Sequence, residues 1–387
     1  MIATLLILFA QSDSLTTTPM DTWSFWREME TVEECEKGQE YLLSNYKTLD
    51  VELKFPDGRL SGFTPISTVM MIYPREKGMP LLESLLENGA NINWIPPCAG
   101  CRSPKSNMCG QSAFISTLSF LDIDEMERII SKWQPRLSYD YEHRRFSEAH
   151  LESMDESWRK TVIEGGYDKE ILSFNALNSL LRHTSAKEEI IKLLVDNGIS
   201  PNQVDHYGNS PLHTIVNRDT SDHIVSYPSA SVIKTSKLLL DLGADINLRN
   251  NSGTSVLGAA ARFTTPDVVN FLIDQGASLS SRNENGASLL ELSAVRGDKL
   301  KTLEAYRIVS SHLKLKSEVI SILLSKREWS QADIVGALIQ SAEYADLQLI
   351  DMFLSKLQET ISVQEEVDLW DALSSHSNPY PIMNHLL

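Results

Sequence analysis

The sequence contains few cysteines, no long apolar run and comparatively little positive charge. Four cysteines in 387 residues are too few for a disulfide framework. No apolar run reaches the ~18–20 residues that a membrane-spanning helix requires. The chain has 35 basic and 52 acidic residues, and its net charge of −17 disfavours binding to nucleic-acid phosphates. We therefore expect no membrane span and no nucleic-acid partner, and the charge favours a basic partner protein.

The short motifs of common catalytic and nucleotide sites are also missing. The sequence contains no G-x-x-x-x-G-K-[ST], no G-x-G-x-x-G and no G-x-S-x-G. Adjacent carboxylates such as Glu33 and Glu34 point in different directions on a helix, which is typical of a solvated face. We therefore expect no enzyme activity and no catalytic residues.

Acidic residues are concentrated near the two ends of the chain. Residues 21–50 hold eight acids and three bases, and residues 341–371 hold eight acids and one base. Residues 2–10 form an apolar stretch that resembles the core of a secretion signal. However, no Lys or Arg precedes it, and Leu8 stands where a signal prefers a small residue. We expect a cytoplasmic protein, with secretion as the alternative.

One phrase recurs along the middle of the chain. A helix-like apolar run is followed by a glycine, which suits the left-handed residue that ends a helix. The apolar residues lie one, three and four positions apart, so they share one helix face. These glycines are Gly89, Gly198, Gly243 and Gly276, and the last two are 33 residues apart. The same offsets place Met126, Ile129 and Ile130 before Gln134, which indicates a degenerate copy without the glycine.

A second phrase precedes the helices, and its clearest copy is YGNSPLHTIV at 207–216. A turn-prone glycine is followed by a small hydroxyl residue, and then by a proline, which is favourable at a first helical position. Weaker copies lie at 61–68, 109–116, 251–261 and 284–294.

Together the two phrases resemble the ankyrin repeat consensus, best at 208–213 (GNSPLH) and 238–247 (LLLDLGADIN). In that family each unit is a β-turn finger followed by two antiparallel helices, and the units stack. The resemblance implies an all-α ankyrin-repeat solenoid of about six units. This number exceeds the minimum of about three units that a continuous buried core requires.

Departures from the 33-residue period divide the chain into parts. We expect an N-terminal segment with a cap helix at 1–45, a repeat array at 46–315, and a helical cap or degenerate repeats at 316–387. The array should contain insertions near 94–109, 141–172 and 217–232. Insertions in repeat arrays map to loops, often on the binding face.

Three cysteines form the sharpest local pattern, Cys98-x-x-Cys101 with Cys109 nearby. Such a cluster can supply thiolate ligands to zinc, but no local residue completes a set of four. Unpaired thiols and a disulfide are the alternatives. We therefore predict no required cofactor, with a zinc site at Cys98, Cys101 and Cys109 as the alternative.

The resemblance also implies roles for individual residues. His213 and Ser210 fall on the family's "TPLH" signature, where the histidine links neighbouring loops, so we interpret both as structural. Trp94 lies in an extended finger where consensus residues are polar, and an exposed Trp is a plausible interface anchor.

Ankyrin arrays bind proteins, usually through finger tips and first helices. The predicted binding residues are Trp94, Asp205, His206, Tyr207, Arg249, Asn250, Asn251, Arg282, Asn283 and Glu284. The hypothesis is a non-catalytic protein-binding scaffold that acts as a stoichiometric binder or inhibitor, with a lean towards a bacterial toxin-neutralising immunity-type protein. A secreted effector that binds a host protein and a zinc- or thiol-responsive adaptor are the alternatives.

Overall fold

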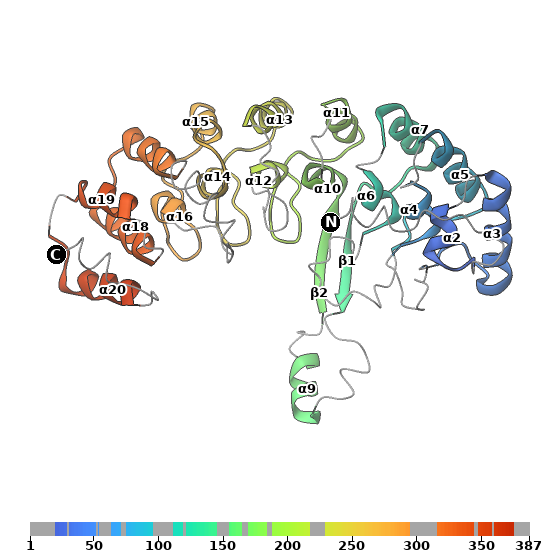
Figure 1. Cartoon of the computed structure of the whole chain (residues 1–387), viewed down its shortest axis with the longest axis horizontal. Helices are drawn as coiled ribbons and strands as arrows, with labels where there is room; N and C mark the ends of the chain where they lie inside the picture. Colours follow the sequence, from blue (N-terminus) through green and yellow to red (C-terminus); the bar gives the residue numbers. More distant parts are fainter. Residues whose placement is uncertain are drawn as a thin grey trace. The chain divides into compact units, whose positions relative to one another are not determined.

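The computed structural model describes most of the chain between residues 20 and 374 and divides it into two units. The described residues are 20–28, 31–51, 53, 63–70, 75–95, 111–118, 121–144, 155–164, 169–183, 188–216, 229–294, 316–343, 347–357 and 360–374. One unit spans Met1–Leu180 and the other Leu181–Leu387, and each is described by itself. Both are built mainly of short helices (Figure 1). The predicted all-α class is thus confirmed.

The first unit is built on helix pairs. Its helices are α2 (Trp23–Glu28), α3 (Val32–Tyr46), α4 (Pro65–Met70), α5 (Arg75–Glu87), α6 (Ala113–Thr117) and α7 (Ile123–Trp133). Helix α4 contacts α2, α5 and α6, and α3 contacts α5. Large apolar side chains such as Trp26, Leu85 and Phe114 are fully buried in this unit. The unit therefore has its own apolar core.

The N-terminal segment forms two helices where the sequence predicts one cap helix. Helix α3 begins afresh because Thr31 forms a capping box with Glu34, each side chain bonding the other residue's backbone N–H. Helix α2 lies close to α3 at Gly38, where an added Cβ would approach the Phe25 ring to 2.7 Å. Two short helices therefore pack side by side at this end.

A β-hairpin occupies the long insertion predicted near 141–172. Strand β1 (Ser138–Arg144) pairs antiparallel with β2 (Lys169–Asn175), with Tyr139 opposite Phe174. Figure 1 shows the two strands running away from α6, with helix α9 (Glu156–Glu164) beyond their far end. Leu172 is buried, and the Tyr139 hydroxyl accepts the N–H of Ser112, so the base of the hairpin is anchored.

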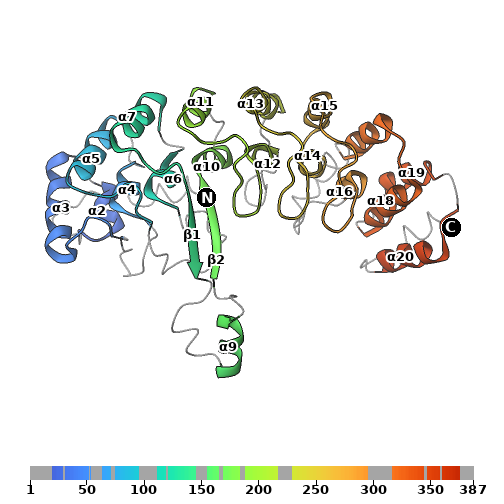
Figure 2. The same cartoon turned by 180° about the vertical axis from the view of Figure 1, so that it is seen from behind.

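The second unit holds its helices in two rows before a C-terminal group. The row α11 (Glu188–Asp196), α13 (Ser229–Asp241) and α15 (Pro266–Asp274) lies over the row α12 (Pro211–Val216), α14 (Val256–Phe263) and α16 (Leu289–Ala294), as Figures 1 and 2 show. Helix α10 (Ala176–His183) crosses the boundary between the units. Within the lower row α12 contacts α14, and α14 contacts α16. This is the stacking expected of repeated helix pairs.

Further helices follow the rows. Residues 316–326 are helical, and α18 (Gln331–Glu343), α19 (Leu347–Leu354) and α20 (Val363–Ser374) come after them. Helix α18 contacts α16, α19 and α20. The segment that the sequence assigns to a cap or to degenerate repeats is thus helical where it is described, and it packs directly on the last helix of the lower row.

Left-handed residues end the second helix of each repeat. Gly89, Gly198, Gly243 and Gly276 have φ between +91° and +96°. Gln134 has φ +46° and its N–H bonds to the Ile130 carbonyl, so it ends α7 as the glycines end their helices. The degenerate copy predicted at Gln134 is therefore confirmed.

A second repeated feature ties successive repeats together. The asparagine four residues after Gly89, Gly198 and Gly243 accepts a backbone N–H from the following repeat. The bonds are Arg136 N to Asn93 Oδ1 at 2.6 Å, Asp245 N to Asn202 Oδ1 at 2.6 Å, and Ser278 N to Asn247 Oδ1 at 2.8 Å. Each tie satisfies a backbone group that would otherwise lack a partner within its own turn.

The other two predicted insertions lie largely outside the described residues. Residues 96–110 are not described, and neither are 217–228. Residues 229–232 form the first turn of α13 rather than loop, so the described end of the third insertion is helical. Among the helices that the structure describes, none is both long and apolar enough to cross a membrane.

Candidate functional site

Three five-residue loops in the second unit share one backbone design, and we call them the fingers. They are residues 205–209, 250–254 and 283–287. In each, the backbone N–H of the first residue donates to the carbonyl of the fifth at 3.0 Å. The glycine at the fourth position, with positive φ, donates its N–H back to the first carbonyl at 2.8–3.0 Å. Each finger is therefore a turn closed by two backbone hydrogen bonds.

An Asp or Asn at the first position holds each finger from inside. Asp205 Oδ1 accepts the N–H groups of Tyr207 and Asn209, each at 2.9 Å. Asn250 Oδ1 does the same for the second and fourth residues after it, and Asn283 Oδ1 accepts the N–H of Ala287 at 2.8 Å. This is the ordinary turn chemistry of these two side chains.

Neighbouring fingers are also bonded to each other. Asn251 donates its N–H to the Tyr207 carbonyl and its side-chain amide to the His206 carbonyl, both at 3.0 Å. Glu284 donates its N–H to the Ser252 carbonyl at 3.0 Å. The three fingers therefore form one continuous row, because each lies within hydrogen-bond distance of the next.

His213 links the first two repeats of this row beneath the fingers. Its Nε2 lies 3.0 Å from the Thr254 carbonyl and its Nδ1 lies 2.8 Å from Ser210 Oγ. The carbonyl only accepts, so Nε2 carries the proton and Nδ1 accepts from Ser210. The predicted loop-bridging role of His213 is confirmed. Burial lowers its pKa from the ordinary value, opposed by the bond to Thr254.

The lowered pKa of His213 makes stability depend on pH. The unfolded chain takes up this proton more readily than the folded chain, so the free energy of unfolding falls as pH drops through the unfolded value of 6.5 towards the folded one. Urea unfolding followed by circular dichroism should show this decline between about pH 8 and about pH 5, a range that brackets the ordinary histidine pKa. In His213→Gln the decline should be shallower, and an unchanged slope would contradict the assignment.

The exposed groups of the row are aromatic and cationic. Tyr207 is 49% exposed and its ring centroid lies 3.9 Å from that of His206. Arg249 and Arg282 are exposed, and each donates to the carbonyl of the glycine in the finger that directly follows it, at 2.8 and 2.9 Å. These bonds hold the guanidinium groups against the row. Tyr and Arg are enriched among residues that contribute most to protein interfaces.

Other predicted binding residues form the inside of the fingers. Asp205 is 4% exposed, and its second oxygen forms an ion pair with Arg182, so it lies in the interior rather than on the surface. Asn250 and Asn283 are half-buried, and their side-chain oxygens hold their own turns. The side chains of Asn251 and Glu284 are exposed on the row.

Trp94 lies in the first unit, whereas the finger row lies in the second. Its side chain is half-buried. Its backbone N–H donates to the Asn91 carbonyl at 2.9 Å, and its backbone carbonyl accepts the N–H of Ala113 at 3.4 Å. It therefore follows a turn and leads towards α6.

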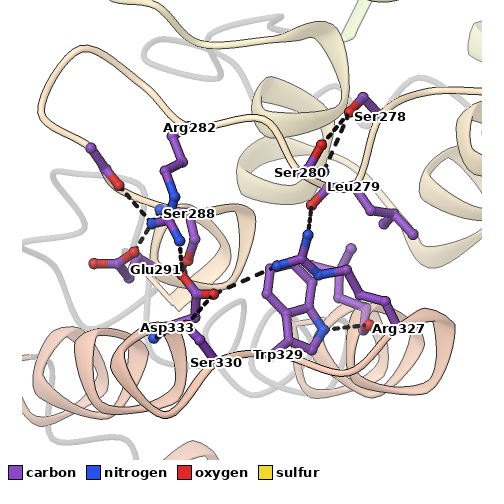
Figure 3. A network of polar contacts seen from close by, with 12 residues as sticks. Ser278, Leu279, Ser280, Arg282, Ser288, Glu291, Arg327, Trp329, Ser330 and Asp333 are labelled. Carbon is purple, nitrogen blue, oxygen red and sulfur yellow. Dashed lines mark hydrogen bonds and ion pairs between the residues drawn. The ribbon is translucent and has the colours of Figure 1, made fainter.

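A charged network that sequence reasoning missed anchors the end of the row (Figure 3). Asp333 at the start of α18 is 1% exposed, and its Oδ1 lies 2.6 Å from Arg282 Nη2. Its Oδ2 accepts from Ser330 Oγ at 2.7 Å and lies 3.6 Å from Arg327 Nη2. Burial alone would raise the pKa of Asp333, but the bonds to Ser330 and Arg282 outweigh it and lower the pKa.

The network reaches past the last finger into the apolar part of the unit. Arg327 donates to the Leu279 carbonyl at 3.2 Å, and its guanidinium lies 4.0 Å from the Trp329 ring. Trp329 in turn donates to the Leu323 carbonyl at 2.8 Å. One finger arginine is thus tied to the C-terminal helices. The Ser330-x-x-Asp333 spacing was the available signal, since it is typical of a helix start.

The predicted metal ligands Cys98, Cys101 and Cys109 lie outside the described residues. Within the part that the structure describes, no group of three or more His, Cys, Asp or Glu is arranged to hold a metal ion. Cys35 is buried in α3, and burial raises the pKa of its thiol to about 11. It is therefore a core thiol.

Comparison with known proteins agrees with this geometry. A family model of ankyrin repeats in three copies matches residues 180–283. A segment of 66 residues is 38% identical to an ankyrin repeat protein of Rickettsia felis, and this match covers 17% of the present chain and 26% of that relative. Residues 180–283 therefore match ankyrin repeats. Repeats of this family indicate a protein–protein interaction scaffold.

Proposed function

We propose that the chain is a non-catalytic scaffold that binds a partner protein through the exposed face of the finger row. The observation that carries this proposal is the combination of exposed Tyr207, Arg249 and Arg282 with a backbone that is hydrogen-bonded within and between the fingers. A surface that is already ordered loses little conformational entropy on binding, which favours affinity. Stoichiometric binding or inhibition is the mode that such a row serves best.

Two electrostatic features support the choice of partner protein: the net charge of the whole chain, which acts at a distance, and the arginines of the row, which act in contact. The net charge of −17 attracts a basic protein at a distance. The row itself presents two arginines, which would contact individual acidic or aromatic groups on that partner. A toxin-neutralising immunity-type protein acting in the cytoplasm fits these properties, and it is the specific form of the proposal.

Affinity capture from the native source with the full chain tests this function. We expect Tyr207→Ser combined with Arg249→Ser to weaken capture by about tenfold or more, because aromatic and arginine anchors dominate interface energies. The matched control is Lys192→Ser combined with Lys237→Ser, which changes exposed residues of α11 and α13. Equal loss in both variants, or loss in neither, would contradict binding through the row.

A further inference from the structure

The last described helix, α20, exposes an apolar strip on one face. Val363 is 79% exposed and Val367 is 45% exposed. Trp370 is partly buried and lies three residues further on, so the three side chains share one face of the helix. Leu369 and Ala372 are buried on the other side, where α20 packs against α18. The strip is therefore the outward face of a helix whose inward face is already covered.

Acidic residues edge this strip on both sides. At 3.6 residues per turn, Glu366 flanks the strip on one side and Asp371 flanks it on the other, with Asp368 further round. Helix α20 contains no Lys or Arg, and none occurs in the sequence after Lys356. No basic residue of the helix therefore offsets the negative charge along the strip.

The start of α20 is firmly capped, which holds the strip in helical form. Ser362 donates its N–H to Glu365 Oε2 at 2.7 Å, and Glu365 donates its N–H to Ser362 Oγ at 3.3 Å. This reciprocal pair is a capping box, and it places Val363 at the first helical position.

We propose that this strip binds a basic amphipathic helix of a partner protein. Apolar residues spaced three and four apart on that helix would cover Val363, Val367 and Trp370, and its Lys or Arg residues would face Glu366 and Asp371. A second copy of α20 fits poorly, because it would bring acidic edges against acidic edges.

Fluorescence anisotropy with the full chain tests the proposal directly. The probe is a labelled peptide of about 14 residues, near the shortest length that forms a helix, with Leu on one face and Lys on the other. We expect this peptide to bind and the same peptide with Glu in place of Lys not to bind. Added salt should weaken binding, because exposed charges are screened.

Variants locate the binding on α20. Val363→Ser combined with Val367→Ser should weaken binding of the Lys peptide by about tenfold or more. Glu366→Lys should also weaken it while leaving the apolar strip intact, so the test survives if the serine pair disturbs folding. The matched control is Val32→Ser, since Val32 is 40% exposed and also follows a capping box, at the start of α3.

Three results would overturn the proposal. One is unchanged peptide affinity in both the serine pair and Glu366→Lys. Another is valine-dependent dimerisation in analytical ultracentrifugation, which would assign the strip to a second copy. The third is an increase in affinity of about tenfold on removing residues 375–387, which would assign the strip to the chain's own C-terminal segment. None of these results depends on the finger row.

Discussion

Gly253→Ala should destabilise the second unit by about 2–4 kcal/mol, the sum of left-handed backbone strain and a steric clash. Gly253 has φ +69°, which costs any other residue free energy. An added Cβ would also lie 2.6 Å from the backbone nitrogen of Glu284 in the next finger. Backbone cannot rotate away as a side-chain end can, so the two fingers would have to separate. Urea unfolding followed by circular dichroism measures the loss.

Two other glycines separate the strain from the clash. Gly286 has a similar φ of +79° but nothing within 4 Å of an added Cβ. Gly286→Ala should therefore cost only about 1 kcal/mol. Gly208→Ala should behave like Gly253→Ala, since its Cβ would lie 2.5 Å from the Asn251 nitrogen. Equal losses for Gly253→Ala and Gly286→Ala would show that the fingers are not in contact.

Asp333→Ala should destabilise the same unit by about 2–4 kcal/mol, because it removes a buried group that holds several partners. The substitution breaks the ion pair with Arg282 and the bond from Ser330, and it leaves Arg327 without its nearby carboxylate. The two arginines are partly exposed, so water can hydrate them, and the cost lies below that of a fully buried pair. Thermal unfolding of the two proteins at neutral pH measures it.

A surface ion pair close by serves as the control for Asp333. Asp274 lies 3.6 Å from Lys326 and its side chain is 67% exposed, so Asp274→Ala should cost less than about 1 kcal/mol. The lowered pKa of Asp333 adds a pH signature. Its stabilisation is complete above the ordinary value of 3.8 and is lost as pH falls below it. The gap between wild type and Asp333→Ala should therefore narrow in acid, whereas a constant gap would contradict the ionised pair.

The repeated part of the fold was predictable because it is local and periodic. The apolar offsets before Gln134 indicated a repeat even without glycine, and its positive φ agrees. The position of His213 in a recognisable signature indicated the bond that it forms with the neighbouring loop. In both cases the deciding information lies within one 33-residue repeat and its equivalents.

The hairpin and the charged network depend on partners that are distant in sequence. Strand β1 alternates aromatic and polar residues, but its charged residues are equally typical of a surface loop. Its pairing partner, β2, begins 25 residues after β1 ends. Arg282 and Asp333 are 51 residues apart, with no repeat to relate them. The ion pair between Asp205 and Arg182 also joins residues that the turn motif alone does not relate. Such contacts follow from tertiary packing.

Hydrogen exchange of the full chain, alone and saturated with its captured partner, tests binding through the finger row most directly. Backbone N–H groups of 205–209, 250–254 and 283–287 report on the row itself. We predict that partner binding slows exchange in these fingers and leaves α11, α13 and α15 unchanged. Slowed exchange confined to α11, α13 and α15, with the fingers unaffected, would contradict the proposed function.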